Sequence, residues 1–367
     1  MEEKITFWEI VKGFESRWFM SVMSTGAVGV FTQFMAKYLH LPVLKQLADF
    51  FVYLALFLVV VVSFVFVLRV VKFFDQVIKD LKHPVAANFF AGINISFAVL
   101  TTAILNVLIP NNSIEHGLGI TLAEICYLIS LVVGISLLVI VPVMLIISKK
   151  VETKHALGIW FLPPVGMFVV AFAGNFLAMH GILKEFIMNF NFFLFGPALM
   201  LYILILNLIY YRLKFHPLPA PEVAPSFVIG LAPIGVSVIA FLSYVKLLKS
   251  SGDFFIDVHV FKTFVEIYSV LIYGFGFWWF AITMIILGYY LVKHKIPYTL
   301  GFWAFVFPLA AFGIGLMLVG EAFKLEFIVK IAVFVWLLVM VVWSFVFIKT
   351  LISVATKKAF IRPKVIN

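Results

Sequence analysis

The side chains that could act on a ligand within this chain are hydroxyls and amides set into long apolar stretches. In the stretches near 17–36, 84–109, 157–180, 223–245 and 297–320, the polar residues are Ser21, Ser24, Thr25, Thr32, Gln33, Asn88, Asn94, Ser96, Thr101, Thr102, Asn106, Asn175, Ser226, Ser237, Ser243 and Thr299. Such groups can donate hydrogen bonds to a passing anion without holding it. Past Arg17, no Asp, Glu, Lys or Arg occurs in these stretches. Buried ionisable residues usually mark tight substrate sites and proton relays, so their absence argues against both.

Other reactive side chains are too scattered for catalysis or metal binding. The single cysteine, Cys126, lies in an apolar stretch and has no second cysteine to pair with. Seven histidines fall near the ends of apolar stretches or between them, without metal-ligand spacing: His83, His116, His155, His180, His216, His259 and His294. We therefore predict no cofactor, no metal site and no enzymatic activity, because a nucleophile and base at membrane depth are missing.

The composition is that of an integral membrane protein. Of the 367 residues, 64% are hydrophobic and only 12% are charged, whereas soluble domains carry about 25% charged residues. Most apolar residues lie in runs long enough to cross about 30 Å of hydrocarbon as a helix. Stretches such as residues 50–68 do not alternate in polarity, which excludes a β-barrel. The predicted fold class is therefore all-α.

The predicted domain organisation is an N-terminal interfacial segment (1–16), a membrane domain (17–353) and a short cytoplasmic tail (354–367). The ten predicted spans are 17–36, 46–71, 84–109, 118–148, 157–180, 183–212, 223–245, 259–292, 297–320 and 326–353. Nineteen of the 27 basic residues fall at the termini or after even-numbered spans. Because basic residues stay on the cytoplasmic side, both termini are predicted to be cytoplasmic. The net charge of +10 then reflects topology in a lipid bilayer and not nucleic-acid binding.

The odd-numbered spans begin near 17, 84, 157, 223 and 297, with separations of 67, 73, 66 and 74 residues. This spacing predicts five tandem two-helix units. The odd helices are rich in Gly and Pro, and broken helices are tolerated only against protein or a polar cavity. We therefore predict an inner ring of odd helices around a pore and an outer ring of even helices. The alternative is that Gly and Pro only permit close helix packing.

Two acidic residues, Glu124 and Glu266, lie in even, outer-class helices. A carboxylate within a membrane span is costly unless it is paired. Each is either a hydrogen-bonded contact between helices or part of a subunit interface.

Five segments of the odd helices resemble the tellurite-resistance/dicarboxylate transporter family. They are WFMSVMSTGAVGV (18–30), HPVAANFF (83–90), IWFLPPVGMFVVAFAG (159–174), HPLPAPEVAPSFVIGLAPIGV (216–236) and GFWAFVFPLAAFGIG (301–315). They occur in the family's order and cover essentially the whole chain. The family includes yeast malate permeases, fungal sulfite efflux proteins and the slow-type anion channels of plant guard cells.

The resemblance implies a homotrimer in which each protomer has its own anion-selective pore. It also implies a plug formed by the phenylalanine before the kink of the ninth helix, which is Phe307 before Pro308, with Phe305 and Phe312 as alternatives. The family's first-helix motif is matched by residues 23–26, with Ser24 in place of the usual glycine. The pore-lining candidates are Ser24, Thr25, Gly26, Phe90, Asn94, Pro164, Gly166, Pro233, Pro308 and Phe312.

The function predicted on this basis is transport of small inorganic or organic anions across the plasma membrane through a gated, channel-like pore. Two alternatives remain open within the same family resemblance. One is a proton-coupled carrier of C4-dicarboxylates such as malate. The other is an efflux protein for sulfite or tellurite-related anions.

Overall fold

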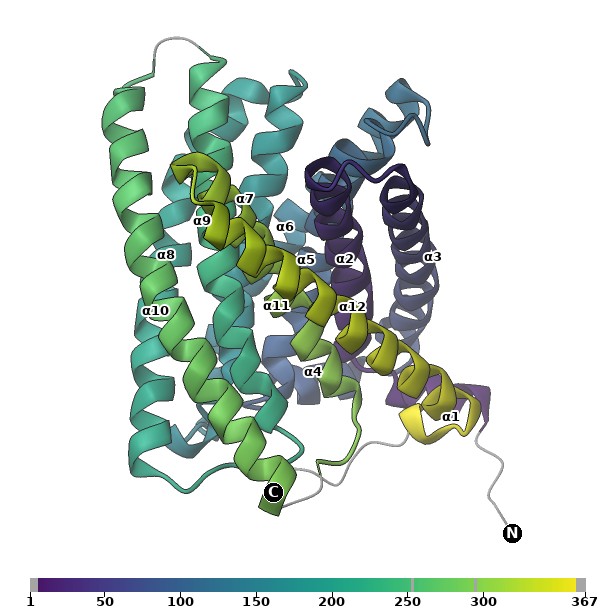
Figure 1. The fold of residues 1–367 in the computed structure, drawn as a ribbon. Coiled ribbons are helices and arrows are strands. Elements are labelled where there is room, and N and C mark those ends of the chain that lie inside the picture. Colours follow the sequence, from purple (N-terminus) through teal and green to yellow (C-terminus); the bar gives the residue numbers. More distant parts are fainter. Residues whose placement is uncertain (1–5, 252–253, 294–295, 361–367) are drawn as a thin grey trace.

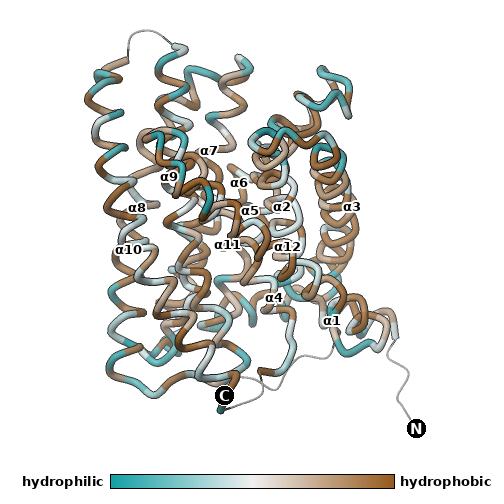
Figure 2. The backbone as a smooth tube through the Cα atoms, in the orientation of Figure 1, coloured by the Kyte–Doolittle hydropathy of each residue, from teal (hydrophilic) through white to brown (hydrophobic). Residues whose placement is uncertain are grey.

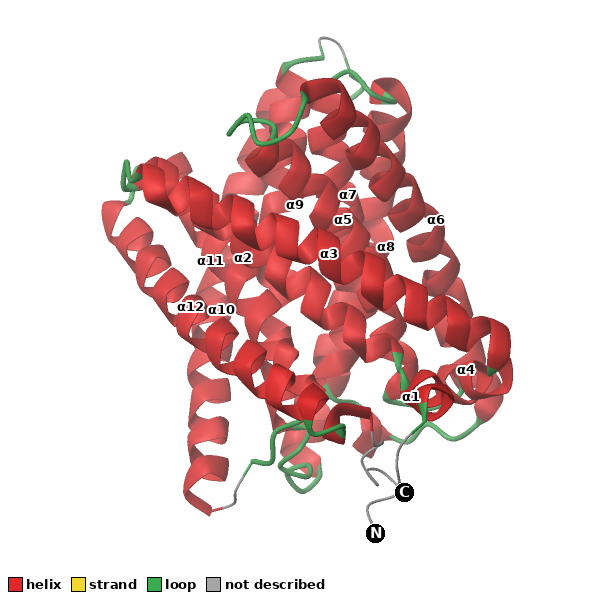
Figure 3. Ribbon diagram, turned by 90° about the vertical axis from the view of Figure 1, so that its right-hand side faces the viewer, coloured by secondary structure: helices red, strands yellow, loops and turns green. Residues whose placement is uncertain are grey.

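The structure is a computed structural model that describes residues 6–251, 254–293 and 296–360. Throughout this part of the chain the regular elements are helices, joined by loops (Figures 1 and 3). Ten of the helical stretches are long and apolar enough to cross a membrane: Ser16–Tyr38, Pro42–Lys72, Ala86–Leu108, His116–Ser148, Gly158–Met179, Lys184–Phe215, Ala224–Lys249, Val258–Lys293, Leu300–Phe323 and Glu326–Ala355. Each end lies within about four residues of its predicted position, so the ten-span, all-helical prediction is confirmed.

Burial separates the ten stretches into two classes that alternate along the chain. In the odd-numbered stretches, 83–94% of the most apolar window is buried, whereas in the even-numbered ones the share is 22–33%. The α-helices of the odd stretches are α2 (Phe19–Tyr38), α5 (Ala91–Ala103), α7 (Leu162–Met179), α9 (Leu231–Lys249) and α11 (Trp303–Phe323). Those of the even stretches are α3 (Pro42–Lys72), α6 (His116–Ser148), α8 (Lys184–Phe215), α10 (Val258–Lys293) and α12 (Glu326–Ala355).

The inner helices form a closed ring in chain order. Contacts run from α2 to α5, α7, α9 and α11, and α11 returns to α2. Each inner helix also packs on the outer helix that follows it in sequence. Figure 2 shows hydrophobic residues along the lengths of the helices, with hydrophilic residues gathered toward their ends and loops. The predicted inner and outer classes are therefore present as a ring of buried helices within a coat of exposed ones.

Every inner helix begins with a short 3₁₀ segment that continues into its α-helix. These segments are η1 (Ser16–Trp18), η2 (Ala86–Phe90), η5 (Gly158–Phe161), η6 (Ala224–Gly230) and η7 (Leu300–Phe302). Side chains from other helical segments donate to carbonyls in or just before these turns. The indole of Trp160 donates to the carbonyl of Pro84 at 3.0 Å, and that of Trp279 donates to Phe227 at 3.0 Å. The repeat predicted from spacing thus recurs as a local backbone feature.

Both described ends of the chain meet on one face of the bundle, which we call the terminal face. It carries α1 (Phe7–Gly13) and the end of the described chain, η8 (Lys358–Phe360), as Figure 1 shows. The rings of Trp18 and Phe360 stack there with centroids 5.7 Å apart. Within the predicted interfacial segment, Val11 and Phe14 are buried and Trp8 is exposed, while Ile5 lies outside the described residues. All five inner helices start at the terminal face and end at the opposite face.

A buried ion pair ties the first outer helix to the terminal face. Arg69 near the end of α3 is fully buried, and its Nη2 lies 2.6 Å from Oδ2 of Asp80 in α4 (Phe74–Leu81). Its Nε also donates to the carbonyl of Lys12 at 3.1 Å. Burying a charge is costly without such partners, so this arginine fixes α3, α4 and α1 together.

Candidate functional site

A central cavity of about 170 Å³ lies within the ring of inner helices. It is lined by residues of all five inner stretches: Ala27, Val30, Phe34, Lys37, Val99, Thr102, Asn106, Phe172, Phe176, Val236, Ile239, Leu242, Ser243, Lys246, Phe307, Ala311, Ile314 and Leu318. None of these residues belongs to an outer helix. The cavity is therefore a product of the ring itself.

The lining residues recur at helical spacing along each wall. In α11 they are Phe307, Ala311, Ile314 and Leu318, steps of four, three and four residues. A helix has 3.6 residues per turn, so such a series forms one straight stripe on one face. The walls of α2 and α9 follow the same rule, and each ends at a lysine. One continuous face of each of these helices thus borders the cavity.

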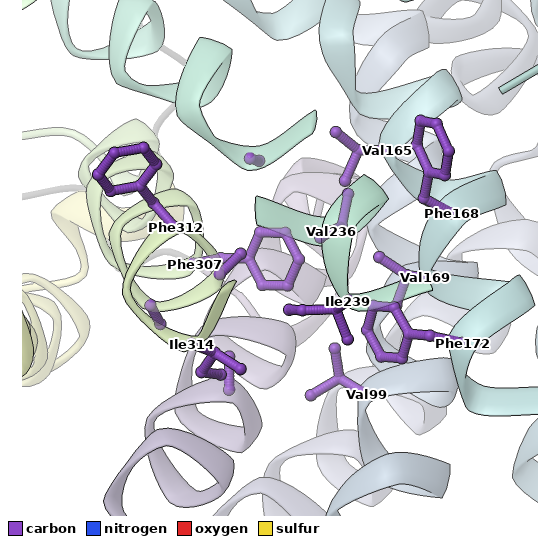
Figure 4. Close-up of a cluster of buried hydrophobic side chains, with 14 of the residues drawn as sticks. Val99, Val165, Phe168, Val169, Phe172, Val236, Ile239, Phe307, Phe312 and Ile314 are labelled. Atoms are coloured by element: carbon purple, nitrogen blue, oxygen red, sulfur yellow. The ribbon is translucent and has the colours of Figure 1, made fainter. Parts of the chain in front are cut away.

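Phe307 lines the cavity near its end toward the terminal face. It lies in the second turn of α11, is only 2% exposed, and precedes Pro308 inside the helix. Figure 4 shows its ring pointing away from α11 toward Val236 and Ile239 of α9. A flat, apolar ring therefore borders the cavity on this side.

The other two phenylalanines considered for this role point elsewhere. Phe312 packs against the outer helix α10, where its ring centroid lies 5.1 Å from that of Tyr273. Figure 4 shows its ring pointing away from that of Phe307. Phe305 packs beside Phe302, with centroids 5.5 Å apart. Of the three, Phe307 alone is among the residues that line the cavity.

The opposite end of the cavity carries two basic side chains, Lys37 of α2 and Lys246 of α9. Both are exposed, and neither forms an ion pair within the described part of the chain. No carboxylate is among the lining residues. This end therefore presents positive charge to an approaching solute, and the field favours anions.

The sequence prediction missed these lysines because it ended two helices too early. It placed the ends at residues 36 and 245, whereas α2 continues to Tyr38 and α9 to Lys249. Extending the apolar stripes by one turn would have found them, since Lys37 follows Phe34 by three residues and Lys246 follows Ser243 by three.

Three uncharged polar groups also line the cavity, and local hydrogen bonds occupy much of their capacity. The hydroxyls of Thr102 and Ser243 donate to the carbonyls of Ala98 and Ala240 at 3.1 and 2.9 Å. The amide of Asn106 donates to the carbonyl of Thr102 at 3.0 Å. An amide nitrogen carries two hydrogens, so Asn106 retains donor capacity for a ligand.

Asn106 lies within η3 (Ile104–Leu108), a π-helical turn that ends the third stretch. Such turns are rare and are frequent at functional sites, because they redirect a side chain out of the regular helical register. Behind the cavity, Asn175 donates to the Ser243 hydroxyl at 2.9 Å, and Asn191 of α8 donates to Asn175 at 2.8 Å. This amide pair fixes the wall at Ser243.

Three of the pore-lining candidates lie in the first inner helix, and their side chains or backbone pack against other helices. The Ser24 hydroxyl donates to the carbonyl of Trp303 in α11 at 3.1 Å. The Thr25 hydroxyl accepts from the indole of Trp343 in the outer helix α12 at 3.1 Å. A Cβ built on Gly26 would lie 2.8 Å from Val99 Cγ1. These residues connect helices, and none is among those lining the central cavity.

The remaining candidates are also buried in contacts between helices. Phe90 packs on Phe66 of α3, with ring centroids 6.1 Å apart. Asn94 lies between Gly134 and Gly166, and its amide nitrogen and oxygen are buried without a hydrogen-bond partner in the described chain. A further set consists of buried prolines: Pro164, Pro233 and Pro308. A role of these residues in lining a conduction path stays a prediction.

The glycines of the inner helices favour the packing interpretation of their abundance. A Cβ on Gly235 would lie 2.2 Å from the carbonyl oxygen of Ala311, and one on Gly315 would lie 2.0 Å from the Tyr273 hydroxyl. Only a residue without a side chain permits such approach. The cavity and the close packing therefore coexist, because different faces of the same helices provide them.

The two acidic residues of the outer helices have different surroundings. Glu266 pairs with Lys262 of its own helix at 3.1 Å, so its contact is within α10 and not between helices. Glu124 of α6 is half-buried and forms no hydrogen bond or ion pair among the described residues. Its side chain is thus partly exposed on an outer helix.

Metal binding finds no support in the described residues, where no group of three or more His, Cys, Asp or Glu side chains gathers. The cavity residues are amides, hydroxyls, two ammonium groups and apolar side chains. Such a set can attract an anion, donate hydrogen bonds to it and exclude it with an aromatic ring.

Comparison with known proteins gives one consistent result over the length of the chain. The profile of the SLAC1 family, described as voltage-dependent anion channel, matches residues 13–351. An uncharacterized transporter of Methanocaldococcus jannaschii, MJ0576, is 33% identical over 356 residues, covering 96% of each chain. The sulfite efflux pump SSU1 of Arthroderma benhamiae is 23% identical over 376 aligned positions, covering 96% of this chain and 94% of the pump.

Proposed function

Because this chain belongs to the SLAC1 family of anion channels and transporters, we propose that it conducts small anions through its central cavity, with Phe307 as the gate. The observation that carries the proposal is the cavity itself. All five inner stretches line it, Phe307 lies toward the terminal face, and Lys37 and Lys246 border the opposite end.

The proposed path runs between the two faces of each protomer. Lys37 and Lys246 raise the local concentration of anions at the open end. Asn106 then offers an amide donor deeper in the cavity. At Phe307 the path is apolar, and a constriction of this kind blocks ions by steric obstruction and dewetting. Conduction requires the ring to rotate away or the start of α11 to move.

Channel-like passage is favoured over proton-coupled transport because the described cavity walls hold no carboxylate or histidine. Coupled carriers usually bury ionisable residues along the path to relay protons. A proton-coupled C4-dicarboxylate transporter is the alternative. Malate uptake into proteoliposomes that increases with an imposed proton gradient would favour that alternative.

A second candidate substrate is sulfite, because relatives over nearly the full length are sulfite efflux pumps. Sulfite and chloride are both small anions that Lys37 and Lys246 would attract. Their relative flux separates a general anion path from a sulfite-selective one. Tellurite-related efflux would be assayed in the same vesicles.

We propose a plasma-membrane location with both termini cytoplasmic, which makes the terminal face the cytoplasmic one. This orientation follows from the basic residues at the termini and after the even helices. We also propose a homotrimer. The half-buried Glu124 on an outer helix supports an interface, since a carboxylate facing lipid without a partner is costly.

The gate is tested by replacing Phe307 with alanine. Removing the ring opens the apolar constriction, so Phe307→Ala should raise chloride and nitrate flux by about tenfold or more, equivalent to about 1.4 kcal/mol off the barrier. Flux would be measured in proteoliposomes for chloride, nitrate, sulfite and malate, with and without a proton gradient.

Matched controls come from the same helix. Phe305→Ala and Phe312→Ala make the same change at residues that do not line the cavity, and both should leave flux near the parent level. A correctly folded Phe307→Ala protein with unchanged flux would remove Phe307 from the mechanism. If flux increases only in Phe312→Ala, the gate would instead be assigned to Phe312, next to α10.

A further inference from the structure

A second cavity, of about 350 Å³, opens at the terminal face and is separate from the central one. Three segments form its walls: residues 13–18 before α2, residues 298–300 before α11, and the end of α12 with η8. No residue of α5, α7 or α9 contributes to it. This volume lies in the range of small-molecule sites, which is about 300–1,000 Å³.

The charges around this terminal cavity are predominantly positive. Arg17, Lys349 and Lys358 line it, and Glu15 supplies the one carboxylate among the lining residues that the structure describes. Arg17 Nη2 lies 3.0 Å from Glu15 Oε2, so these two charges offset each other. Lys349 and Lys358 are exposed and form no ion pair within the described residues. Two ammonium groups without a carboxylate partner among the described residues therefore border one cavity, and that of Lys349 also lies 5.8 Å from the ring centroid of Phe345.

Hydrogen-bond donors add to this charge. Arg17 Nε is buried and has no partner in the described chain. The hydroxyl of Ser353 in the wall makes no hydrogen bond to another described residue, whereas that of Thr356 donates to the carbonyl of Ile352 at 2.8 Å. A buried donor left unpaired costs free energy, and a ligand oxygen would remove that cost. The wall thus combines ammonium groups, a guanidinium N–H and a hydroxyl.

The cavity also has an apolar part, formed by Trp18, Leu300 and Ile352. One side of the wall is held firmly. The Tyr298 hydroxyl lies 2.6 Å from the Thr350 hydroxyl oxygen, and Thr350 also accepts from the indole of Trp303 at 3.1 Å. The cavity is therefore a formed site with a polar, cationic side and an apolar side, next to the start of α11.

We propose that this cavity binds a phosphate group carried by a small organic molecule. Lysine and arginine side chains with hydroxyl donors are the usual partners of phosphate oxygens. The volume leaves room for an attached organic part against Trp18 and Ile352. A phosphate of this kind comes either from a water-soluble phosphate ester or from the headgroup of an anionic lipid. Binding here does not depend on whether Phe307 gates the central cavity.

The test uses the purified full-length protein and measures binding directly. Inorganic phosphate and glycerol 3-phosphate would be titrated by calorimetry against protein in detergent. Phosphatidylglycerol and phosphatidylcholine would be compared by native mass spectrometry after reconstitution in nanodiscs. Lys349→Gln combined with Lys358→Gln should weaken binding by about tenfold or more, since both ammonium groups that attract the phosphate are removed.

The matched control is Lys214→Gln combined with Lys293→Gln. It makes the same charge change at exposed positions outside the cavity, near the ends of α8 and α10 that lie at the terminal face. This control should change affinity by less than about twofold, because exposed charges outside the cavity are screened within roughly 10 Å. Selective loss of binding in the Lys349→Gln, Lys358→Gln variant supports the site. If only inorganic phosphate or glycerol 3-phosphate binds, the phosphate comes from a soluble ester; if only phosphatidylglycerol binds, it comes from a lipid headgroup. Absence of binding by all four ligands, or equal loss in both variants, would overturn the proposal.

Discussion

Gly235 and Gly274 belong to the two helices of one hairpin, the inner helix α9 and the outer helix α10, but their surroundings differ completely. A Cβ on Gly235 would lie 2.2 Å from the carbonyl oxygen of Ala311 in α11. A Cβ on Gly274 would meet no atom within 4 Å. Glycine in the inner ring therefore permits two backbones to touch, whereas in the outer ring it replaces a side chain that would project from the bundle.

The same contrast applies to polar side chains. In the inner ring, Ser24 and Asn175 donate to other helices and are fully buried. In the outer helix α10, Glu266 pairs only with Lys262 of its own helix. Inner residues are constrained by neighbours on all sides, and outer residues mostly by the solvent or lipid that they face. Matched substitutions in the inner and outer rings test this difference in packing.

The largest expected effect is that of Gly235→Ala. The new methyl group would collide with main-chain atoms of α11, which cannot rotate away as a side chain could. We expect a loss of stability of at least about 3 kcal/mol, at the upper end of overpacking effects. Thermal unfolding followed by fluorescence-detected size exclusion would measure it, together with the yield of monodisperse protein.

Gly274→Ala is the matched control on the partner helix. Here the methyl group has open space, and alanine is the better helix former by about 1 kcal/mol. This variant should be as stable as the parent or slightly more stable. Equal destabilisation of both variants would contradict the distinction between the two rings.

A smaller effect is expected at the open end of the central cavity. Lys37→Gln combined with Lys246→Gln removes the positive charge and should lower anion flux by about threefold or more at low ionic strength, since such charge concentrates anions locally. The loss should shrink in 1 M salt, where the screening length falls to about 3 Å. Proteoliposome flux at two salt concentrations provides the measurement.

Lys249→Gln serves as control for this pair, because Lys249 is exposed near the end of α9 but does not line the cavity. Its flux should match the parent at both salt concentrations. If Lys249→Gln lowers flux as much as the pair does, general surface charge explains the effect and the cavity lysines have no special role.

The sequence predicts the global arrangement well, and it identifies the cavity wall poorly. The ten spans and the alternation of inner and outer helices follow from apolar length and from Gly and Pro content. The sequence does not indicate which face of each inner helix borders the cavity, because these helices are apolar and buried all round. The pore-lining candidates included Ser24, Thr25 and Asn94, which contact other helices. They left out Thr102, Asn106 and Ser243, which belong to the polar residues noted in the sequence and do line the cavity. The wall beside Phe307 consists mainly of Ala, Val, Ile and Leu residues.

The structure places Phe307, the gate candidate, in the cavity wall, and its role as a gate stays a prediction. It precedes Pro308, the proline inside the inner helix α11, and the family resemblance carried that position directly. Once Phe307 is placed, the steps of three and four residues give Ala311, Ile314 and Leu318 without further information. The lysines required the true helix ends, which depend on how far each helix extends beyond its apolar run.

The smallest predicted effect concerns Thr25, where the two interpretations of an inner polar residue give opposite results. Its hydroxyl accepts from the indole of Trp343 in α12, so it joins an inner helix to an outer one. Thr25→Val keeps the shape and removes the acceptor, which should cost about 1 kcal/mol of stability. Trp343→Phe should cost a similar amount of stability from the lost hydrogen bond, together with the lost packing of the indole, and the double variant should cost less than the sum of the two.

Because Thr25 does not line the cavity, the ratio of nitrate to chloride flux in Thr25→Val should stay at the parent value. A changed ratio with unchanged stability would mean that Thr25 faces the conduction path, and that the inner helices rotate from their positions in this structure when anions pass.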